Sequence, residues 1–369
     1  MTVRRWIAAL LAVGVLCLSL GGCGNKELHQ RILIHGIGVD RTSDGYRVTV
    51  RSATGTEEGG EELFTCQGTT VLEALSSLSL STGREPFYSH NYLVVFGRSC
   101  GEEGLDQSLD FFIRYYNTRP GVKLYLAEES AEEILSIKSD GSWLPMWELQ
   151  ELGQSGAYNG QVVSADILEF VNGSQRPGSS PVLPVLRAGE DKAEVVGSAY
   201  FRDYRLQGFL TLEQTRGYLA LQGDLKGGEM VVSQSQLGTV TLTISGSSRK
   251  LQMEWDGDES PVFRTILQVE ADISSLAGRE IQGEAFYQQV EEVAAQQLQQ
   301  EMEETWKQAL LQDRCDIFGY GNLLSQKEPA LWSEWEEDWE EKMGTCRYEF
   351  QVTVKVPRLE RGTLISERS

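Results

Sequence analysis

Apolar positions recur at strand spacing in two early segments of the chain. Arg31–Asp40 is apolar and bears glycine, and Tyr46–Ala53 alternates between apolar and polar side chains. Ser43-Asp44-Gly45 between them supplies turn residues, so the two segments predict a β-hairpin. Thr54–Glu62, which is rich in Gly and Glu, is expected to be a loop.

Helical patterns follow in the same half of the chain. Thr70–Glu73 and Ser130–Glu133 each match a capping box at the start of an apolar helical repeat, and Gly83 is a plausible end for the first helix. Asp106 is expected to cap a third helix, which ends before Pro120. Two further strands are predicted, at Tyr92–Gly97 and Val122–Leu126. Because strands and helices interleave with at least one hairpin, this half is predicted to be α+β.

The pattern weakens between Ser139 and Pro184 and then returns. Ala165–Val171 is expected to form a short helix, and Asn172–Pro184 reads as a connector rich in Pro, Gly and Ser. Strand patterns resume after it, at Val195–Phe201, Arg205–Leu212, Thr239–Ser245, Lys250–Trp255, Phe263–Ile273 and Arg347–Val356.

The longest helical pattern runs from Gly283 to Gln312. Its apolar side chains form one stripe among Gln and Glu, which predicts a helix packed on a mostly antiparallel sheet. Trp332, Trp335 and Trp339 then recur at helical spacing among acidic residues. Packing onto the last strand is the favoured role for these tryptophans, and a contact surface for a partner helix is the alternative.

The start of the chain has the order of a secretory signal. Arg4-Arg5 precedes the uncharged stretch Trp6–Leu20, which is shorter than the roughly 20 apolar residues of a spanning helix. Leu20-Gly21-Gly22-Cys23 resembles the bacterial lipobox, where cleavage precedes a cysteine whose thiol receives a lipid. We therefore expect a mature protein that begins at Cys23 and is lipid-anchored on the extracytoplasmic face of a membrane. An uncleaved anchor and a twin-arginine export route are the alternatives.

These patterns divide the chain into five regions. The folded part is predicted to be α+β, with mixed or antiparallel sheets and packed helices. The predicted regions are a signal peptide (1–22), a lipidated tether (23–30), an N-terminal α+β domain (31–138), a middle region or small domain with the connector (139–190), and a C-terminal α+β domain (191–369).

Charge narrows the range of partners. Lys and Arg number 33 against 54 Asp and Glu, which gives a net charge of −21. Such an excess argues against nucleic-acid binding and against a basic membrane-binding surface. Because anionic headgroups would repel an acidic body, membrane attachment would have to come from the lipid.

The cysteines leave two readings open. Cys17 lies in the predicted signal. The four cysteines after Cys23 could form disulfides in an exported protein, and four cysteines can pair in three ways. One reading is a pair of disulfides within the domains, and the other is four free, partly buried thiols. The disulfide reading joins Cys66 to Cys100 and Cys315 to Cys346.

Candidate catalytic groups are few. His90 lies beside Ser89, but neighbouring side chains on an extended chain point apart, and a hydrogen-bonded structural role is favoured for His90 and for His35. Gly36–Asp40 lacks the third glycine of a dinucleotide-binding loop, so its glycines indicate a bulge or a close backbone approach. The third histidine is His29, and none of the three lies at the spacing from a cysteine that a metal site would need. We expect no enzyme activity, no metal and no cofactor.

An ordered series of short motifs resembles the Ger(x)C family, the lipoprotein C subunits of spore germinant receptors. The motifs, in chain order after the lipobox, are Glu27-Leu28, Gly36-Ile37-Gly38-Val39-Asp40, Gly45-Tyr46-Arg47-Val48-Thr49-Val50, Glu73-Ala74-Leu75, Ser89-His90, Asp110-Phe111-Phe112-Ile113-Arg114, Gly197-Ser198-Ala199-Tyr200-Phe201 with Leu206 and Gly208, Asp316-Ile317-Phe318-Gly319, and Pro329 with Trp332. The chain departs from the family pattern at Gly24-Asn25, where Trp-Asp is usual, and at Tyr200, where Val is frequent.

The resemblance implies a function without catalysis. A family member stands beside two integral membrane subunits, A and B, in a receptor of the inner spore membrane that senses nutrients such as amino acids or sugars and triggers germination. The family's C subunit is built from three α+β domains. A solute-binding lipoprotein of an importer is the alternative, although such proteins usually have two doubly wound lobes. A cell-envelope hydrolase is disfavoured because no nucleophile or metal cluster can be assembled.

Overall fold

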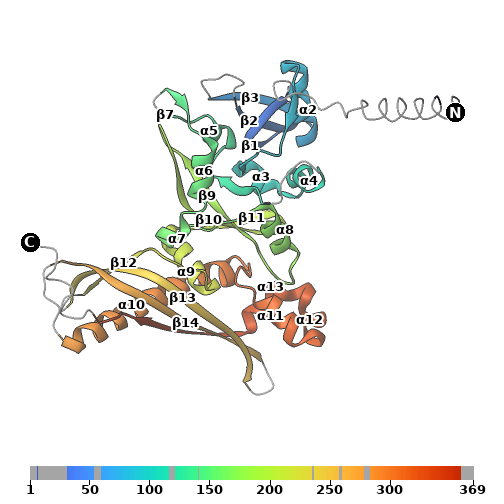
Figure 1. Cartoon of the computed structure of the whole chain (residues 1–369). Coiled ribbons are helices and arrows are strands. Elements are labelled where there is room, and N and C mark those ends of the chain that lie inside the picture. Colours follow the sequence, from blue (N-terminus) through green and yellow to red (C-terminus); the bar gives the residue numbers. More distant parts are fainter. Residues whose placement is uncertain are drawn as a thin grey trace, which may run out of the picture.

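Two main β-sheets with helices packed on them make up the protein (Figure 1). This computed structural model describes residue 6 and residues 31–53, 60–115, 121–139, 141–234, 237–256, 260–277 and 283–358. Mixed sheets and packed helices confirm the predicted α+β class.

The first sheet has nine strands, in the order β11-β10-β9-β6-β5-β1-β2-β3 with β4 beside β1. Its centre is parallel, because β1 pairs with β5, β5 with β6 and β6 with β9 in the same direction. Antiparallel pairs continue the sheet on both sides. The strands are β1 (Arg31–Thr42), β2 (Gly45–Ala53), β3 (Glu61–Gly68), β4 (Glu85–Phe87), β5 (Leu93–Phe96), β6 (Lys123–Ala127), β9 (Val182–Ala188), β10 (Ala193–Arg202) and β11 (Arg205–Leu210), and a separate small hairpin joins β7 (Lys138–Ser139) to β8 (Ser142–Trp143).

The predicted hairpin β1–β2 is confirmed, whereas the neighbouring strand β3 was not predicted. Its side chains are mostly half-buried, and only Cys66 is fully buried, so β3 lacks the clean alternation of a strand with one buried face. It lies at the edge of the sheet, paired only with β2. The expected loop Thr54–Glu62 therefore ends in a strand, and residues 54–59 lie outside the described residues.

Seven helices of the described chain accompany this sheet. They are α2 (Val71–Thr82), α3 (Arg98–Glu103), α4 (Asp106–Arg114), α5 (Ala131–Leu135), α6 (Met146–Leu152), α7 (Gly156–Asn159) and α8 (Ile167–Gln175). Thr70 and Ser130 cap their helices as predicted, but the reciprocal bond of a capping box is not seen in either, and Glu73 is bonded to Thr69 instead. Gly83 ends α2 in the left-handed conformation. The predicted cap at Asp106 is wrong, because Leu105 occupies that position and Asp106 is the first helical residue.

The first sheet continues through the predicted connector. Helix α8 extends to Gln175 and β9 begins at Val182, inside the segment expected to be a linker. Strands β10 and β11 then pair onto β9, although the sequence assigned them to the C-terminal domain. The domain ranges stay a prediction, but backbone pairing crosses the expected boundary at residues 190–191.

The second sheet has the order β12-β13-β14-β15 and is antiparallel except for the β14–β15 pair. Its strands are β12 (Glu229–Gln234), β13 (Gly238–Asp256), β14 (Ser260–Ala277) and β15 (Arg347–Lys355). Thr239–Ser245 and Lys250–Trp255 are parts of one strand, so the predicted turn between them is wrong. A bulge between Ile244 and Gly246 takes its place, because the strand bends there without breaking its pairing with β14.

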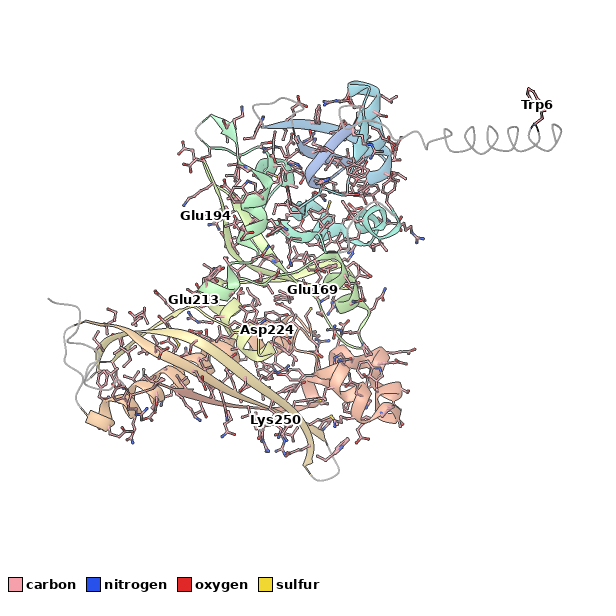
Figure 2. The ribbon with its side chains drawn as sticks, in the orientation of Figure 1. Trp6, Glu169, Glu194, Glu213, Asp224 and Lys250 are labelled. Carbon is pink, nitrogen blue, oxygen red and sulfur yellow. The ribbon has the colours of Figure 1, made fainter. Side chains whose placement is uncertain are left out.

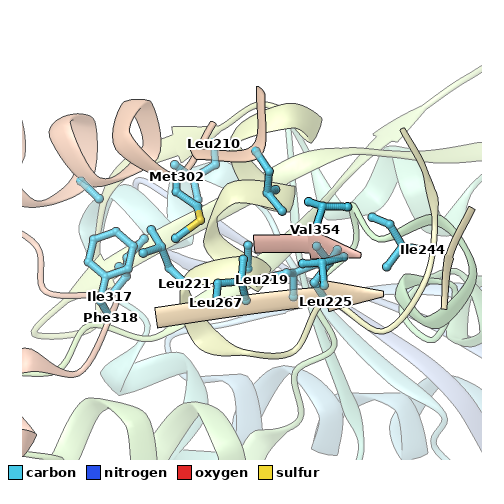
Figure 3. Close-up of a cluster of buried hydrophobic side chains, with 14 of the residues drawn as sticks. Leu210, Leu219, Leu221, Leu225, Ile244, Leu267, Met302, Ile317, Phe318 and Val354 are labelled. Atoms are coloured by element: carbon cyan, nitrogen blue, oxygen red, sulfur yellow. The ribbon is translucent and has the colours of Figure 1, made fainter. Parts of the chain in front are cut away.

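Helices α9 (Leu212–Gln222) and α10 (Gly283–Trp306) pack against each other and onto this sheet, and a π-helical turn, Lys307–Gln312, continues α10. The predicted long helix is therefore confirmed. Figure 3 shows Leu219 and Leu221 of α9 and Met302 of α10 with Leu267 and Val354 of the sheet in one buried cluster. The remaining helices are α11 (Tyr320–Lys327), α12 (Pro329–Trp335) and α13 (Trp339–Lys342).

Candidate functional site at the junction of the two sheets

The Gly36–Asp40 motif connects strand β1 of the first sheet to the start of helix α5. A side chain at Gly38 would press on Ala131, the first residue of α5, so the glycine lets this helix lie close to β1. The Asp40 carboxylate then accepts the backbone N–H groups of Ala131 and Glu132, at 2.8 and 2.9 Å. Burial raises the pKa of Asp40, although the two backbone N–H groups act in the opposite direction. The predicted close backbone approach is confirmed.

The Asp316 loop is built in the same way at the start of α11. Its carboxylate accepts four backbone N–H groups, from Phe318, Gly319, Tyr320 and Gly321. The Asp316 carbonyl accepts the Ser180 N–H at 2.9 Å, from the chain that leads into β9. Burial raises the pKa of Asp316, opposed by those four N–H groups. The loop therefore connects the C-terminal helices to the first sheet.

Strand β10 makes a second connection between the sheets. The Tyr200 hydroxyl donates to the Asp313 carboxylate, just beyond the long helix. The Arg202 guanidinium donates to the Arg314 carbonyl at 3.1 Å and lies 2.9 Å from a Glu340 carboxylate oxygen. Tyr200 thus carries a polar contact that an apolar side chain could not make.

A cleft of about 550 Å³ opens at this junction. One wall comes from α8 and the chain up to β9, and the other comes from the end of α9, β13, the Asp316 loop and α11. Figure 2 labels Glu169 and Asp224, which line it from the two walls. Phe170, Tyr218 and Leu323 supply part of its apolar lining.

The acidic groups of the cleft already have partners. The Glu169 carboxylate accepts the Asp166 N–H in the capping box of α8. Asp224 lies 3.4 Å from the Lys226 ammonium, and Asp316 holds its four backbone N–H groups. Each of these carboxylates therefore already binds backbone N–H groups or a neighbouring ammonium group.

Two arginines in the cleft have no ion-pair partner within the described ranges. Arg249 donates from one terminal nitrogen to the Phe318 carbonyl at 3.3 Å, and its buried Nε has no hydrogen-bond partner. Burial lowers the pKa of the Arg249 guanidinium. Arg176 lines the opposite wall. The cleft can hold a small polar molecule by hydrogen bonds, and its lining contains neither His nor Cys for nucleophilic catalysis.

The four cysteines after Cys23 are buried free thiols in the structure, and Cys23 lies outside the described residues. Neither Cys66–Cys100 nor Cys315–Cys346 is bonded, because each sulfur faces a backbone carbonyl instead, those of Val48, Val39, Asp313 and Lys342 in chain order. Burial raises the pKa of Cys66 to about 11 and that of Cys315 and Cys346 to about 12. The second of the two sequence readings is the one that the structure shows.

The histidines lie apart from the cleft. His35 of β1 places Nδ1 2.9 Å from a Glu61 carboxylate oxygen and rests against the Tyr92 ring. Glu61 also pairs with the fully buried Arg51 at 2.5 Å, so His35 belongs to a buried structural network. His90 is exposed beside Phe87, and His29 lies outside the described residues.

Trp332 and Trp339 are buried and in edge-to-face contact, so burial of these two tryptophans is confirmed, whereas their packing onto the last strand stays a prediction. They close over Gly178, where a side chain would collide with both rings. In the ranges covered by the structure, His, Cys, Asp and Glu do not gather in groups suited to a metal ion. No described helix combines the length and the apolar character needed to span a membrane.

Sequence reasoning missed the cleft because its walls come from segments far apart in the chain. The walls meet through β9–β11, which the sequence assigned to two different regions. Helix α9 was missed as well, since it is buried nearly all round and shows no apolar stripe. Its capping box, Thr211 with Gln214, was the available signal.

Comparison with known proteins adds family information to this geometry. Residues 24–188 match the model "Spore germination protein N-terminal domain". Residues 196–360 match the model "Spore germination B3/GerAC like, C-terminal". The two matches follow each other in order and leave out little of the chain.

Two similar proteins come from Bacillus subtilis (strain 168). Spore germination protein B3 is 20% identical over 358 residues, covering 92% of this chain and 95% of the relative. Spore germination protein KC is 24% identical over 378 residues, with 92% of each chain covered. The crystal structure of the GerBC protein superimposes on this chain with a TM-score of 0.61 and 18% sequence identity. The superposition covers 88% of this chain and 97% of the GerBC chain, so the two share a fold.

Proposed function

This chain belongs to the GerAC-like family of spore germination proteins, and we propose that it is the lipid-anchored C subunit of a nutrient germinant receptor. The observation that carries the proposal is the ordered match to two germination-protein models over residues 24–188 and 196–360. Similarity to two germination proteins over nine-tenths of the chain supports it.

In this role the protein acts by assembly with the integral membrane subunits A and B. Cleavage before Cys23 and acylation of its thiol would hold the body on the outer face of the inner spore membrane. Two or more acyl chains hold a protein firmly, whereas one chain binds marginally. Confinement to the bilayer raises the effective concentration of the body toward membrane partners.

Replacement of the anchor residue tests the membrane part of the proposal. In Cys23→Ala, the protein should leave the membrane fraction of spores, and nutrient-triggered germination should be impaired. Cys17→Ala is the matched control, because that residue lies in the predicted signal and should not affect anchoring. A Cys23→Ala protein that still sediments with membranes lacking subunits A and B would show that lipid is not the anchor.

Deletion tests the germination role. Spores without this protein, in a strain with no sister receptor, should fail to germinate with the nutrient that the receptor senses. A trigger that acts without nutrient receptors should still germinate them, which controls for spore viability. Normal germination with every nutrient tested would contradict the proposal.

A solute-binding lipoprotein of an importer is the second candidate, and the polar cleft with its unpaired arginines is the observation in its favour. The largely antiparallel second sheet differs from the doubly wound lobes usual in such proteins. Calorimetric detection of tight binding of one nutrient by the purified protein would favour this candidate.

A further inference from the structure

Helix α2 presents an outer face that is almost uncharged. Leu72 is 48% exposed and Leu80 is 89% exposed, although both are large and apolar. The only charged residue of the helix, Glu73, is held at its first turn by the N–H and hydroxyl of Thr69. In a chain in which 24% of residues are charged, an exposed helix face would ordinarily carry several charges.

Most exposed positions of α2 fall on one side of the helix, where Glu73 and Ser81 are exposed as well. Leu72, Ser76 and Ser79 follow each other at four- and three-residue steps, which places them along one line, with Leu80 beside it. We call these four residues the α2 outer face. The opposite side is buried in the core of the first sheet through Val71, Ala74, Leu75 and Leu78.

The α2 outer face lies close to the point where the tether joins the body. Strand β4 begins two residues after Gly83, the cap of α2, and Glu85 of β4 pairs with Arg31 of β1. Arg31 is separated from Cys23 by eight residue steps, a reach of at most about 28 Å when extended. A lipid on Cys23 therefore keeps this corner of the molecule near the bilayer.

Two arginines lie at this corner of a strongly acidic protein. The Arg31 guanidinium lies over the Phe87 ring, 4.9 Å from its centroid. Arg84 and Glu85 follow α2, and Arg84 is paired with Glu62 at 3.2 Å. Arginine and aromatic side chains of this kind suit the headgroup region of a membrane. The rest of a chain with a net charge of −21 would be repelled by anionic headgroups.

From these observations we propose that the α2 outer face, with β4 at its end, rests directly on the lipid bilayer, and that Leu80 enters the boundary between headgroups and acyl chains. The inference rests on the lipid anchor of the proposed function. The tether and the face then act as two attachments, which together fix the orientation of the body. The cleft at the junction of the sheets is walled by α8, α9, β13 and α11. Figure 1 shows α9 and α11 far from α2, so a bilayer at α2 would leave the cleft accessible to partners.

The occupant is lipid rather than protein because of where the tether attaches. The groove next to the α2 outer face is bordered on its α4 side by Asp106, Asp110 and Arg114, of which Asp110 and Arg114 form an ion pair. The outer face itself consists of Leu and Ser side chains, and the one charge beside it, Glu73, is hydrogen-bonded to Thr69. A short tether brings that face to the bilayer whether or not a protein partner is present.

A fluorescent probe at Leu80 tests the proposal. Leu80→Cys in the full acylated chain is labelled with the environment-sensitive dye NBD and reconstituted in vesicles of phosphatidylcholine with phosphatidylglycerol. Val231→Cys, at a 54% exposed position of β12 in the other sheet, is the matched control. The native cysteines after Cys23 are buried and should not take up the dye.

The proposal predicts that the dye at position 80 shifts its emission to shorter wavelength and is quenched by lipids brominated on their acyl chains, while the dye at position 231 does neither. A position-80 dye that stays aqueous although the protein floats with the vesicles would overturn this inference alone. Protein that does not float with vesicles would overturn the lipid anchor, and the inference with it. A position-80 dye that becomes shielded only after membrane subunits A and B are added would show that a protein covers this face, and would also overturn the proposal.

Discussion

Asp40 and Asp316 perform the same task at two places in the fold. Each carboxylate is buried and collects the N–H groups at the start of a helix, α5 for Asp40 and α11 for Asp316. Side-chain oxygens at helix starts satisfy N–H groups that the helix itself cannot. In both motifs, therefore, the aspartate that helped to suggest the family connects two structural elements.

Asp40→Ala should destabilise the protein by about 1–3 kcal/mol, because two buried N–H groups of α5 lose their acceptor. Urea unfolding measures the loss. Ser130→Ala is the matched control, since it removes a single, exposed cap bond of the same helix and should cost about 1 kcal/mol or less. An Asp40→Ala protein as stable as wild type would contradict the structural role of the motif.

The buried thiols should be inert in the folded protein. Thiolate is the reactive form, and burial raises the pKa of Cys66 to about 11 and of Cys346 to about 12. Iodoacetamide at pH 8 should therefore leave the four cysteines after Cys23 unmodified until denaturant is added, as read by mass spectrometry. Cross-linked peptides between Cys66 and Cys100 from unreduced protein would instead support the disulfide reading.

The sequence predicted elements best where local chemistry is self-contained. The β1–β2 hairpin and the caps of α2 and α5 depend on neighbouring residues, so their signals survive in the sequence. Helix α9 packs on the distant helix α10 and is buried nearly all round, so periodicity did not reveal it. Strand β12 alternates in burial and pairs with the next strand, β13, so its local signal was present but was missed. The continuous strand β13 was divided because Gly246 reads as a turn residue, whereas pairing with β14 holds it in a bulge.

Gly197 should be among the least replaceable glycines of the described chain. Its φ is +149°, and a side chain there would overlap the Leu210 carbonyl of the neighbouring strand. We expect Gly197→Ala to cost more than about 1 kcal/mol. Gly246→Ala is the control, because nothing lies within 4 Å of its added methyl group, and its effect should stay within about 0.5 kcal/mol. Thermal unfolding compares the two, and equal losses would contradict the backbone argument.

The Arg216–Glu301 pair should couple α9 to α10. The guanidinium makes two hydrogen bonds to the carboxylate, at 2.7 and 2.6 Å, and both side chains are buried. Arg216→Met should cost about 3–5 kcal/mol, because Glu301 is left as an unpaired buried charge.

Arg216→Met combined with Glu301→Leu is the companion variant and should recover most of that loss, because no buried charge then remains. Denaturant unfolding of the two single variants and the double variant measures the coupling. Additive losses in the double variant would show that the two side chains do not act as a pair.

At the scale of the whole molecule, the two sheets are joined where the sequence predicted a separation. Strands β9–β11 pair into the first sheet, and Tyr200 and Arg202 of β10 contact the segment that follows α10. The α+β class and the long helix could be predicted from periodicity, but the cleft could not, since its walls are distant in sequence. The predicted role of the molecule came from the order of motifs along the chain, which the two family models match.

The central claim is that this body works as one subunit of a membrane receptor. Purification of the tagged full chain from detergent-solubilised spore membranes, with mass spectrometry of the proteins retained, tests it most directly. We predict that the integral membrane subunits A and B are recovered with the chain in comparable amounts, and that Cys23→Ala reduces their recovery. Recovery of the chain without them, or with the permease of an importer instead, would contradict the account.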